Sequence, residues 1–368
     1  MQISGSVTRL APGVAVLVLY SGIAMARGPL MSSDSSRYQD WAQALIGSHF
    51  AYWQWATGSF FMPPLAYAGW VTIVAGATLM FGDSSRWALV GLNVAVVFAA
   101  TVLLLRLVGR TAGSWLAALA TAGLVGLAFD LWSWIPYVLT DSLFAALAFE
   151  AFYLVQTGRG RWAFLLAVVS LAFRPDGIAL CVFVVVSVLP RRPLVLIGCF
   201  AIVPFAALLM YNPALWPFPA LHDVLTAAGE SYRSGYVIMG RPSTSLPPPH
   251  GYLQYVLLGL YRVGYYFVYW APGFSSRHLA INLVFYTILY VGVVLAAIRA
   301  FAAAYAGLLF AVVFALFHGL QQLDFDWRYR LPCLLPLIYL AIVGYSRAWL
   351  ALRQPNNEPA RPLSAVSF

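Results

Sequence analysis

Apolar stretches of about the length of a membrane span recur along nearly the whole chain, and short polar segments separate them. Their hydrophobic residues do not alternate with polar ones, as the strands of a membrane β-barrel would require. The pattern therefore predicts an all-α fold, a polytopic transmembrane helical bundle with roughly 9 to 11 membrane segments. The apolar runs that we expect to form helices are residues 10–26, 63–82, 87–107, 114–129, 142–156, 194–210, 279–297, 300–317 and 331–345.

Two further apolar runs, residues 162–173 and 177–189, are each too short to cross a hydrocarbon core of about 30 Å at about 1.5 Å per residue. They flank the sequence Arg-Pro-Asp-Gly at residues 174–177. Broken backbone is tolerated at membrane depth where protein buries it or where it lines a cavity. We therefore expect a re-entrant helix pair whose break lies inside the bundle.

Composition places the chain among integral membrane proteins, because 62% of its 368 residues are hydrophobic, 9% are charged and the mean hydropathy is +0.81. The net charge of +9 comes entirely from Arg, since the chain has no Lys. Such a charge favours cytoplasmic loops and anionic lipid headgroups, and we expect no nucleic-acid partner. The three Cys residues lie in apolar runs without paired spacing, so no disulfide framework is predicted.

The distribution of Arg predicts which loops face the cytoplasm. Arg clusters follow the runs that end near residues 107 and 156, and they predict that these two loops face the cytoplasm. This assignment requires that run 63–82 does not cross the membrane fully. We expect a bacterial-type inner (plasma) membrane, with residues 1–346 as one domain and 347–368 as a disordered cytoplasmic tail. The loops expected outside, the first and third of them with interfacial helices, are residues 27–62, 130–141, 211–251 and 321–330.

The first outside loop contains two carboxylates, Asp34 and Asp40, in a chain that is otherwise strongly apolar. Residues 35–46 are expected to form a short helix with Asp34 at the N-cap, where its side chain can accept hydrogen bonds from free backbone N–H groups. Tyr38, Trp41, Ala42 and Leu45 would then share one face, as in a helix lying in the membrane interface. The alternative is that Asp34 is a simple cap and Asp40 a solvated charge.

Four polar clusters adjoin apolar runs: Asp34 with Asp40, then Asp141, then Arg174 with Asp176, and residues 324–330. Charged groups at such positions are usually paired or face water. One interpretation is structural ion pairs, such as Arg174 with Asp176 and Arg328 with Asp326. The other is an outside-facing cavity in which Arg binds the phosphate of an anionic lipid and a carboxylate acts as general base.

Five short motifs occur in order along the chain: SDSSRY at 33–38, MPPL at 62–65, LTDSL at 139–143, FRPDG at 173–177 and RYRLP at 328–332. Together they resemble the glycosyltransferase C superfamily, most closely the protein O-mannosyltransferases and aminoarabinose transferases. The resemblance implies a multi-span enzyme that takes a sugar from a polyprenyl-phosphate donor on the non-cytoplasmic side. Asp34 would be the catalytic base. Ser35 replaces a second acidic residue frequent in the family, and Met62 replaces a frequent His or Tyr, which leaves the role of Asp40 and of a metal open.

We therefore predict an inverting glycosyltransferase that uses a polyprenyl-phosphate sugar donor and a glycan, lipid or protein acceptor. Asp34 would be the base, and Asp141 would orient substrate or an Arg side chain. A divalent metal is possible, although the five His residues have no ligand spacing and a site would require loops to converge. The residues expected to contact substrate are Tyr38, Asp40, Arg174, Arg233, Arg241, Arg328 and Tyr329.

Two other functions fit the same sequence features. A transporter or flippase of lipid-linked sugars would also use intramembrane carboxylates and a broken helix pair. A polysaccharide ligase or polymerase would depend on Arg233, Arg241 and His250 of the long outside loop rather than on Asp34.

Overall fold

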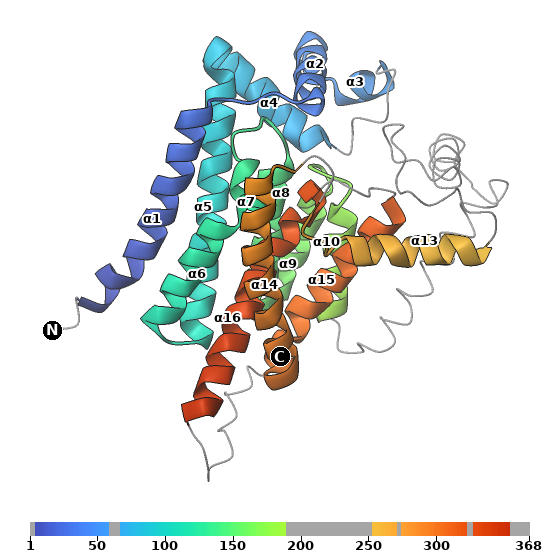
Figure 1. Ribbon diagram of the computed structural model, residues 1–368. Coiled ribbons are helices and arrows are strands. Elements are labelled where there is room, and N and C mark those ends of the chain that lie inside the picture. Colours follow the sequence, from blue (N-terminus) through green and yellow to red (C-terminus); the bar gives the residue numbers. More distant parts are fainter. Residues whose placement is uncertain (1–3, 59–66, 189–251, 271–273, 322–326, 354–368) are drawn as a thin grey trace.

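The computed structural model describes residues 4–58, 67–188, 252–270, 274–321 and 327–353, and within these ranges the chain is helical (Figure 1). One isolated bridge, between Leu30 and Tyr137, is the exception there. The all-α class is therefore confirmed for the described residues. The helices are α1 (Ser4–Arg27), α2 (Ser33–Gly47), α3 (Tyr52–Gly58), α4 (Ala68–Phe81), η2 (Gly82–Ser84), α5 (Ser85–Thr111), α6 (Trp115–Leu127), α7 (Phe129–Ser133), α8 (Asp141–Gln156), α9 (Gly160–Ser170), α10 (Gly177–Val188), α13 (Tyr252–Tyr265), α14 (Ser276–Arg299), α15 (Phe301–Gln321), η4 (Trp327–Arg330) and α16 (Leu331–Arg353).

Four helical stretches in the described ranges are long and apolar enough to cross a membrane. Large apolar side chains such as Val18, Ile298 and Leu352 are exposed on them and on α1, which is unfavourable in water and natural in lipid. The structure thus supports a membrane protein, as the composition predicts. The four stretches are Ala68–Thr111, Ser276–Arg299, Phe301–Gly319 and Arg328–Arg353.

Helices α2, α3 and α4 lie together at one end of the long helices (Figure 1). The 14 residues of α4 measure about 21 Å at 1.5 Å each, which is less than a hydrocarbon core of about 30 Å. A single 3₁₀ turn, η2, joins α4 to α5, which runs away from that end (Figure 1). The described part of run 63–82 is therefore too short to cross the membrane fully. The prediction that the Arg clusters after residues 107 and 156 face the cytoplasm depends on this run not crossing.

Helix α2 begins two residues earlier than its sequence indicates. Ser32 is the N-cap, and it forms a reciprocal capping box with Ser35, whose backbone N–H donates to the Ser32 hydroxyl at 3.2 Å. Asp34 lies inside the first turn, so the prediction that Asp34 is the cap is wrong. A cap at Ser32 leaves the Asp34 carboxylate available to other partners, while its position in the first turn still favours a negative charge.

The expected buried face of α2 is present. Tyr38, Ala42 and Leu45 are buried, and Trp41 is half-buried beside them. This face packs on apolar side chains of α4, and their contact fixes α2 against the end of the bundle. The partners on α4 include Trp70, Val71 and Val74.

The two short helices predicted around residues 174–177 are α9 and α10, and the turn between them is tightly packed. A Cβ atom at Gly177 would lie 2.8 Å from the backbone nitrogen of Leu171, so a larger residue does not fit there. The backbone N–H of Gly69 in α4 donates to the carbonyl of Ala172 at 2.7 Å, which ties the turn to α4. These contacts hold residues 171–176 against the end of the bundle where α2 lies.

The C-terminal segment is partly helical, since α16 continues to Arg353 and residues 347–353 belong to it rather than to a disordered tail. Arg353 stacks on Trp349 at 4.4 Å, and a cation at a helix C-terminus is favourable. The long loop 211–251, with Arg233, Arg241 and His250, lies outside the described residues, as does the MPPL motif at 62–65.

Candidate functional site

The 3₁₀ turn η4 lies at the centre of the charged residues and positions three side chains differently. A 3₁₀ helix has about three residues per turn, so successive side chains point in three directions. Arg328 reaches α2, Tyr329 lies against Arg174 of the α9–α10 turn, and Arg330 reaches α7. Tyr266 donates a hydrogen bond from its hydroxyl to the Tyr329 carbonyl at 3.0 Å, which fixes the turn in place.

Asp34 and Arg328 form an ion pair between residues 294 positions apart, with the Arg328 Nη1 at 3.0 Å from the Asp34 Oδ2. The side chains are 17% and 14% exposed respectively, so both touch solvent or lipid headgroups. Arg37, one turn along α2, places its Nη1 at 3.6 Å from the Asp34 Oδ1. Arg328 also lies over the ring of Trp134 at 5.5 Å. The carboxylate is thus held by two guanidinium groups at a partly open position.

Arg174 is buried between two carboxylates. It pairs through Nη1 with Asp141 and through Nε with Asp176, the latter at 2.6 Å. Burial alone would lower the pKa of Arg174, but the negative charges of Asp141 and Asp176 outweigh it and raise the pKa well above its usual value. The Arg174 guanidinium also stacks on the ring of Tyr329 at 4.9 Å. The predicted pair of Arg174 with Asp176 is confirmed, and Asp141 is a second partner.

Aromatic side chains connect the two ion-pair groups. Tyr38 and Tyr67 lie 5.4 Å apart between ring centroids, and Trp41 adjoins both. Burial raises the pKa of Tyr38, and neighbouring Tyr67 raises it further. The charge of Arg174 lowers this pKa, whereas the charges of Asp141 and Asp34 raise it. Burial also raises the pKa of Tyr67, and the same three charges and that of Asp176 contribute to this pKa. The guanidinium groups of Arg174 and Arg328 lie 4.9 Å and 5.7 Å from the centre of the Tyr329 ring, so the ion pairs at Asp34 and at Arg174 belong to one continuous charged and aromatic cluster.

A further buried carboxylate, Asp130 on α7, was not among the predicted site residues. It accepts hydrogen bonds from Tyr286 at 2.6 Å and from Asn282 at 3.4 Å, and His278 lies at 3.2 Å. Arg330 completes the group at 3.4 Å. Three of these partners recur at intervals of four residues on α14, so a polar stripe on an otherwise apolar helix is the sequence signal that indicates such a group.

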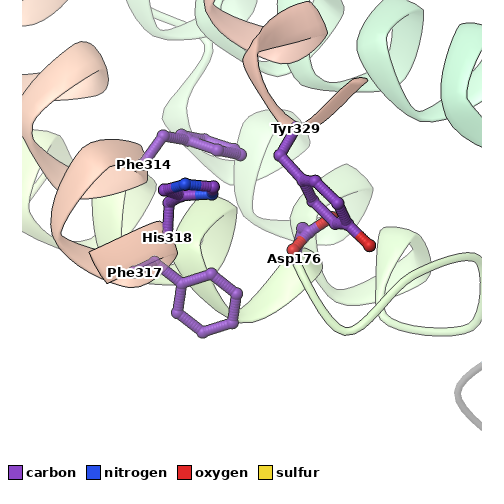
Figure 2. A pocket seen from close by; sticks show the side chains of 5 residues that line it. All are labelled: Asp176, Phe314, Phe317, His318 and Tyr329. Atoms are coloured by element: carbon purple, nitrogen blue, oxygen red, sulfur yellow. The ribbon is translucent and has the colours of Figure 1, made fainter. Parts of the chain in front are cut away.

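A small pocket lies beside the Arg174 cluster, with room for about one water molecule. Figure 2 shows His318, Phe314 and Phe317 of α15 along one side and Tyr329 and Asp176 along the other. Sequence reasoning did not single out His318. The available signal is its position directly after the apolar run 300–317, since a polar side chain that continues an apolar helix requires a partner.

The structure brings together six of the predicted site residues from four distant segments: Asp34, Tyr38, Asp141, Arg174, Arg328 and Tyr329. Asp40 lies on the exposed side of α2 and is not part of this cluster, so its predicted contact with substrate has no support in the geometry. Arg233 and Arg241 lie outside the described residues. Within the described ranges, no group of three His, Cys, Asp or Glu side chains is arranged to hold a metal ion.

No family model matches this chain, and no curated protein and no solved structure matches it either.

Proposed function

We propose that this protein is a polytopic membrane glycosyltransferase that transfers a sugar from a polyprenyl-phosphate-linked donor to an acceptor. The observation that supports the proposal is the convergence just described. Four of the five motifs on which the family resemblance depends contribute side chains to one partly open cluster of carboxylates, guanidinium groups and aromatic rings. A random arrangement of structural ion pairs would not collect all four, because they lie in separate parts of the chain.

In this proposal Arg328 binds the donor phosphate. Arg presents a planar fork of N–H donors and remains charged, which suits phosphate oxygens. The Arg328–Asp34 pair is partly exposed, and such pairs are weak enough for another anion to replace one partner. A donor phosphate that takes the place of the Asp34 carboxylate on Arg328 leaves that carboxylate beside the reacting sugar.

Asp34 would then act as general base. It accepts the proton of the acceptor hydroxyl while the acceptor oxygen forms a bond to the anomeric carbon of the sugar. The bond from that carbon to the phosphate oxygen breaks on the opposite face, so the configuration is inverted. The lipid phosphate leaves with the electron pair, and the guanidinium of Arg328 stabilises its charge. General-base assistance of this kind contributes about 10² to 10⁴ in rate.

Arg174 and Asp141 take a supporting role in the proposal. For Arg174 this role differs from the predicted contact with substrate, whereas for Asp141 it is one of the two predicted roles, the orientation of an Arg side chain. The guanidinium of Arg174 is already shared by two carboxylates and a tyrosine ring, so it is a poor phosphate ligand. Asp141 stands at the first position of α8, and its partner is Arg174. Together they hold the α9–α10 turn and Tyr329 in place, which positions η4 and therefore Arg328.

The proposal places the site at the non-cytoplasmic face of an inner membrane, in a bundle of about 9 to 11 segments. The N-terminal end of α1 and the C-terminal ends of α14 and α16 lie at the end of the bundle opposite to α2 (Figure 1). The last residues of α14 and α16 are Arg299 and Arg353, as expected of cytoplasmic ends. Backbone pairing of Leu30 with the segment at Tyr137 joins two of the predicted outside loops.

The test is sugar transfer by the full chain in vesicles with a polyprenyl-phosphate hexose. We expect Asp34→Asn to reduce transfer at least about 100-fold while polyprenyl-phosphate binding persists. The matched control is Asp83→Asn, since Asp83 is an exposed carboxylate on η2 and is not one of the cluster residues. Movement of the donor across the membrane without any transfer would favour the flippase. Full transfer by Asp34→Asn, with loss on Ala substitution of Arg233, Arg241 and His250, would favour the ligase or polymerase.

A further inference from the structure

We propose that the pocket at His318 is a subsite for one hydroxyl or hydroxymethyl group of the transferred sugar, an inference that rests on the proposed function. The pocket is bounded by Asp176, His318, Tyr329 and two phenylalanines (Figure 2). Its room for about one water molecule corresponds to a single small polar group rather than to a whole sugar ring.

His318 supplies the first reason. The residue is 4% exposed, and its Nδ1 has no hydrogen-bond partner among the residues that the structure describes. Burying an imidazole nitrogen without a partner is unfavourable, so this wall of the pocket carries an unmet hydrogen-bonding capacity. A neutral imidazole nitrogen either donates or accepts, and a hydroxyl group can do both. A hydroxyl therefore satisfies His318 in either tautomer.

The carboxylate of Asp176 supplies the second reason. One of its oxygens accepts from the Arg174 Nε at 2.6 Å, and a carboxylate has about four lone-pair sites, so capacity for another donor remains. Asp141 and Asp176 together carry one negative charge more than Arg174 neutralises. This excess repels the donor phosphate and favours a neutral hydrogen-bond donor, which is the chemistry of a sugar hydroxyl.

Phe314 and Phe317 give the pocket an apolar side next to its polar one (Figure 2). Small-molecule sites commonly combine aromatic walls with a few placed polar groups. An acyl or polyprenyl chain would satisfy the aromatic walls but would leave His318 and Asp176 unpaired. A carbon atom that bears a hydroxyl group can pack on the phenylalanines through the carbon and form hydrogen bonds with His318 and Asp176 through the hydroxyl.

The pocket also lies where the sugar of the proposed donor would be. Tyr329 lines it, and the preceding residue, Arg328, is the proposed phosphate ligand. Arg174 stacks on Tyr329 and binds Asp176, so pocket and cluster share their residues. A donor whose phosphate binds Arg328 thus has its sugar close to the pocket mouth.

The experiment measures binding by the full chain in detergent of polyprenyl phosphate and of its mannose, glucose, galactose and arabinose derivatives. We expect wild type to bind at least one sugar-bearing lipid about tenfold more tightly than polyprenyl phosphate. His318→Phe should remove this preference and leave the affinity for polyprenyl phosphate within about twofold. His49→Phe is the matched control, since His49 is exposed in the turn after α2, and it should keep the preference.

A second measurement uses monodeoxy analogues of the preferred sugar. Removal of one particular hydroxyl should weaken wild-type binding about tenfold and should have no effect in His318→Phe. If His318→Phe also loses polyprenyl phosphate, His318→Ala replaces it in the same comparison. A preference for sugar that survives both substitutions overturns the subsite and leaves the proposed function standing. A wild type that prefers none of the four sugar-bearing lipids overturns both.

Discussion

Two carboxylate–guanidinium pairs are built on the same 3₁₀ turn, and their surroundings differ. Arg330 pairs with Asp130, which is fully buried and has three further polar partners on α14. Arg328, two residues earlier, pairs with Asp34, which is 17% exposed and whose ion-pair partners in the described chain are guanidinium groups. The same kind of ion pair is therefore buried at Asp130 and partly exposed at Asp34.

The difference separates a structural role from a functional one. Asp130 is surrounded by donors and joins α7, α14 and η4 in the interior, so nothing from outside can replace any of its partners. Asp34 can exchange its partner, because a partly solvated ion pair contributes little net free energy. Substitutions at the two aspartates should therefore separate stability from activity, and the predictions below are ordered by the size of that effect.

The largest effect is expected for Asp130→Asn. The substitution leaves the guanidinium of Arg330 buried without its counter-charge, and breaking a buried pair in this way costs about 3–5 kcal/mol. Denaturant-induced unfolding of the purified chain, followed by circular dichroism, should show the loss. Asp83→Asn at an exposed position should change the free energy of unfolding by less than about 0.5 kcal/mol. If Asp130→Asn changed the free energy of unfolding as little as Asp83→Asn does, the Asp130–Arg330 pair would not be the structural anchor that distinguishes it from the Asp34–Arg328 pair.

Acid titration should sharpen the same contrast. Burial alone would raise the pKa of Asp130, but the hydrogen bond with His278 and the charge of Arg330 outweigh it and lower the pKa. A carboxyl group with a lowered folded-state pKa contributes stability that is present above its unfolded pKa, about 3.9, and is lost as the pH falls through the folded value. The stability difference between wild type and Asp130→Asn should therefore be constant from pH 7 to 5 and shrink below about pH 4.

Unfolding midpoints of both proteins at pH 7, 5, 4 and 3 measure this difference. A difference that shrinks already between pH 7 and 5 would mean that the carboxyl group has a raised pKa. Asp130 would then lack the donors that distinguish it from Asp34.

How much of this contrast was accessible from the sequence depends on the kind of feature. The helices follow from the apolar runs, and the charged positions beside them were recognised because such charges require partners. The partners were not predictable. For Arg328 the sequence suggests its neighbour Asp326, which lies outside the described residues. The structure pairs Arg328 with Asp34, 294 positions away, and hydropathy patterns contain no information on which helices meet.

Local chemistry set two further limits. Asp34 and Ser32 are both good N-cap residues, and the reciprocal bond with Ser35 decides for Ser32. The sequence predicts Asp130 at the start of an outside loop, whereas the structure buries it on α7 against His278, Asn282 and Tyr286. The stripe of three polar residues at intervals of four on α14 is visible in the sequence, but the residue that the stripe faces is not.

The smallest effect on stability, and the sharpest test of the comparison, is expected at the open pair. A double-mutant cycle of Asp34→Asn and Arg328→Gln should give a coupling free energy of about 0–1 kcal/mol. Moving from 0.05 to about 0.5 M salt should reduce it further, because exposed charges are screened. Sugar transfer by Asp34→Asn should nevertheless fall at least about 100-fold. A coupling above about 2 kcal/mol that salt leaves unchanged would make Asp34 a second structural anchor like Asp130, and the carboxylate could not then exchange Arg328 for a donor phosphate.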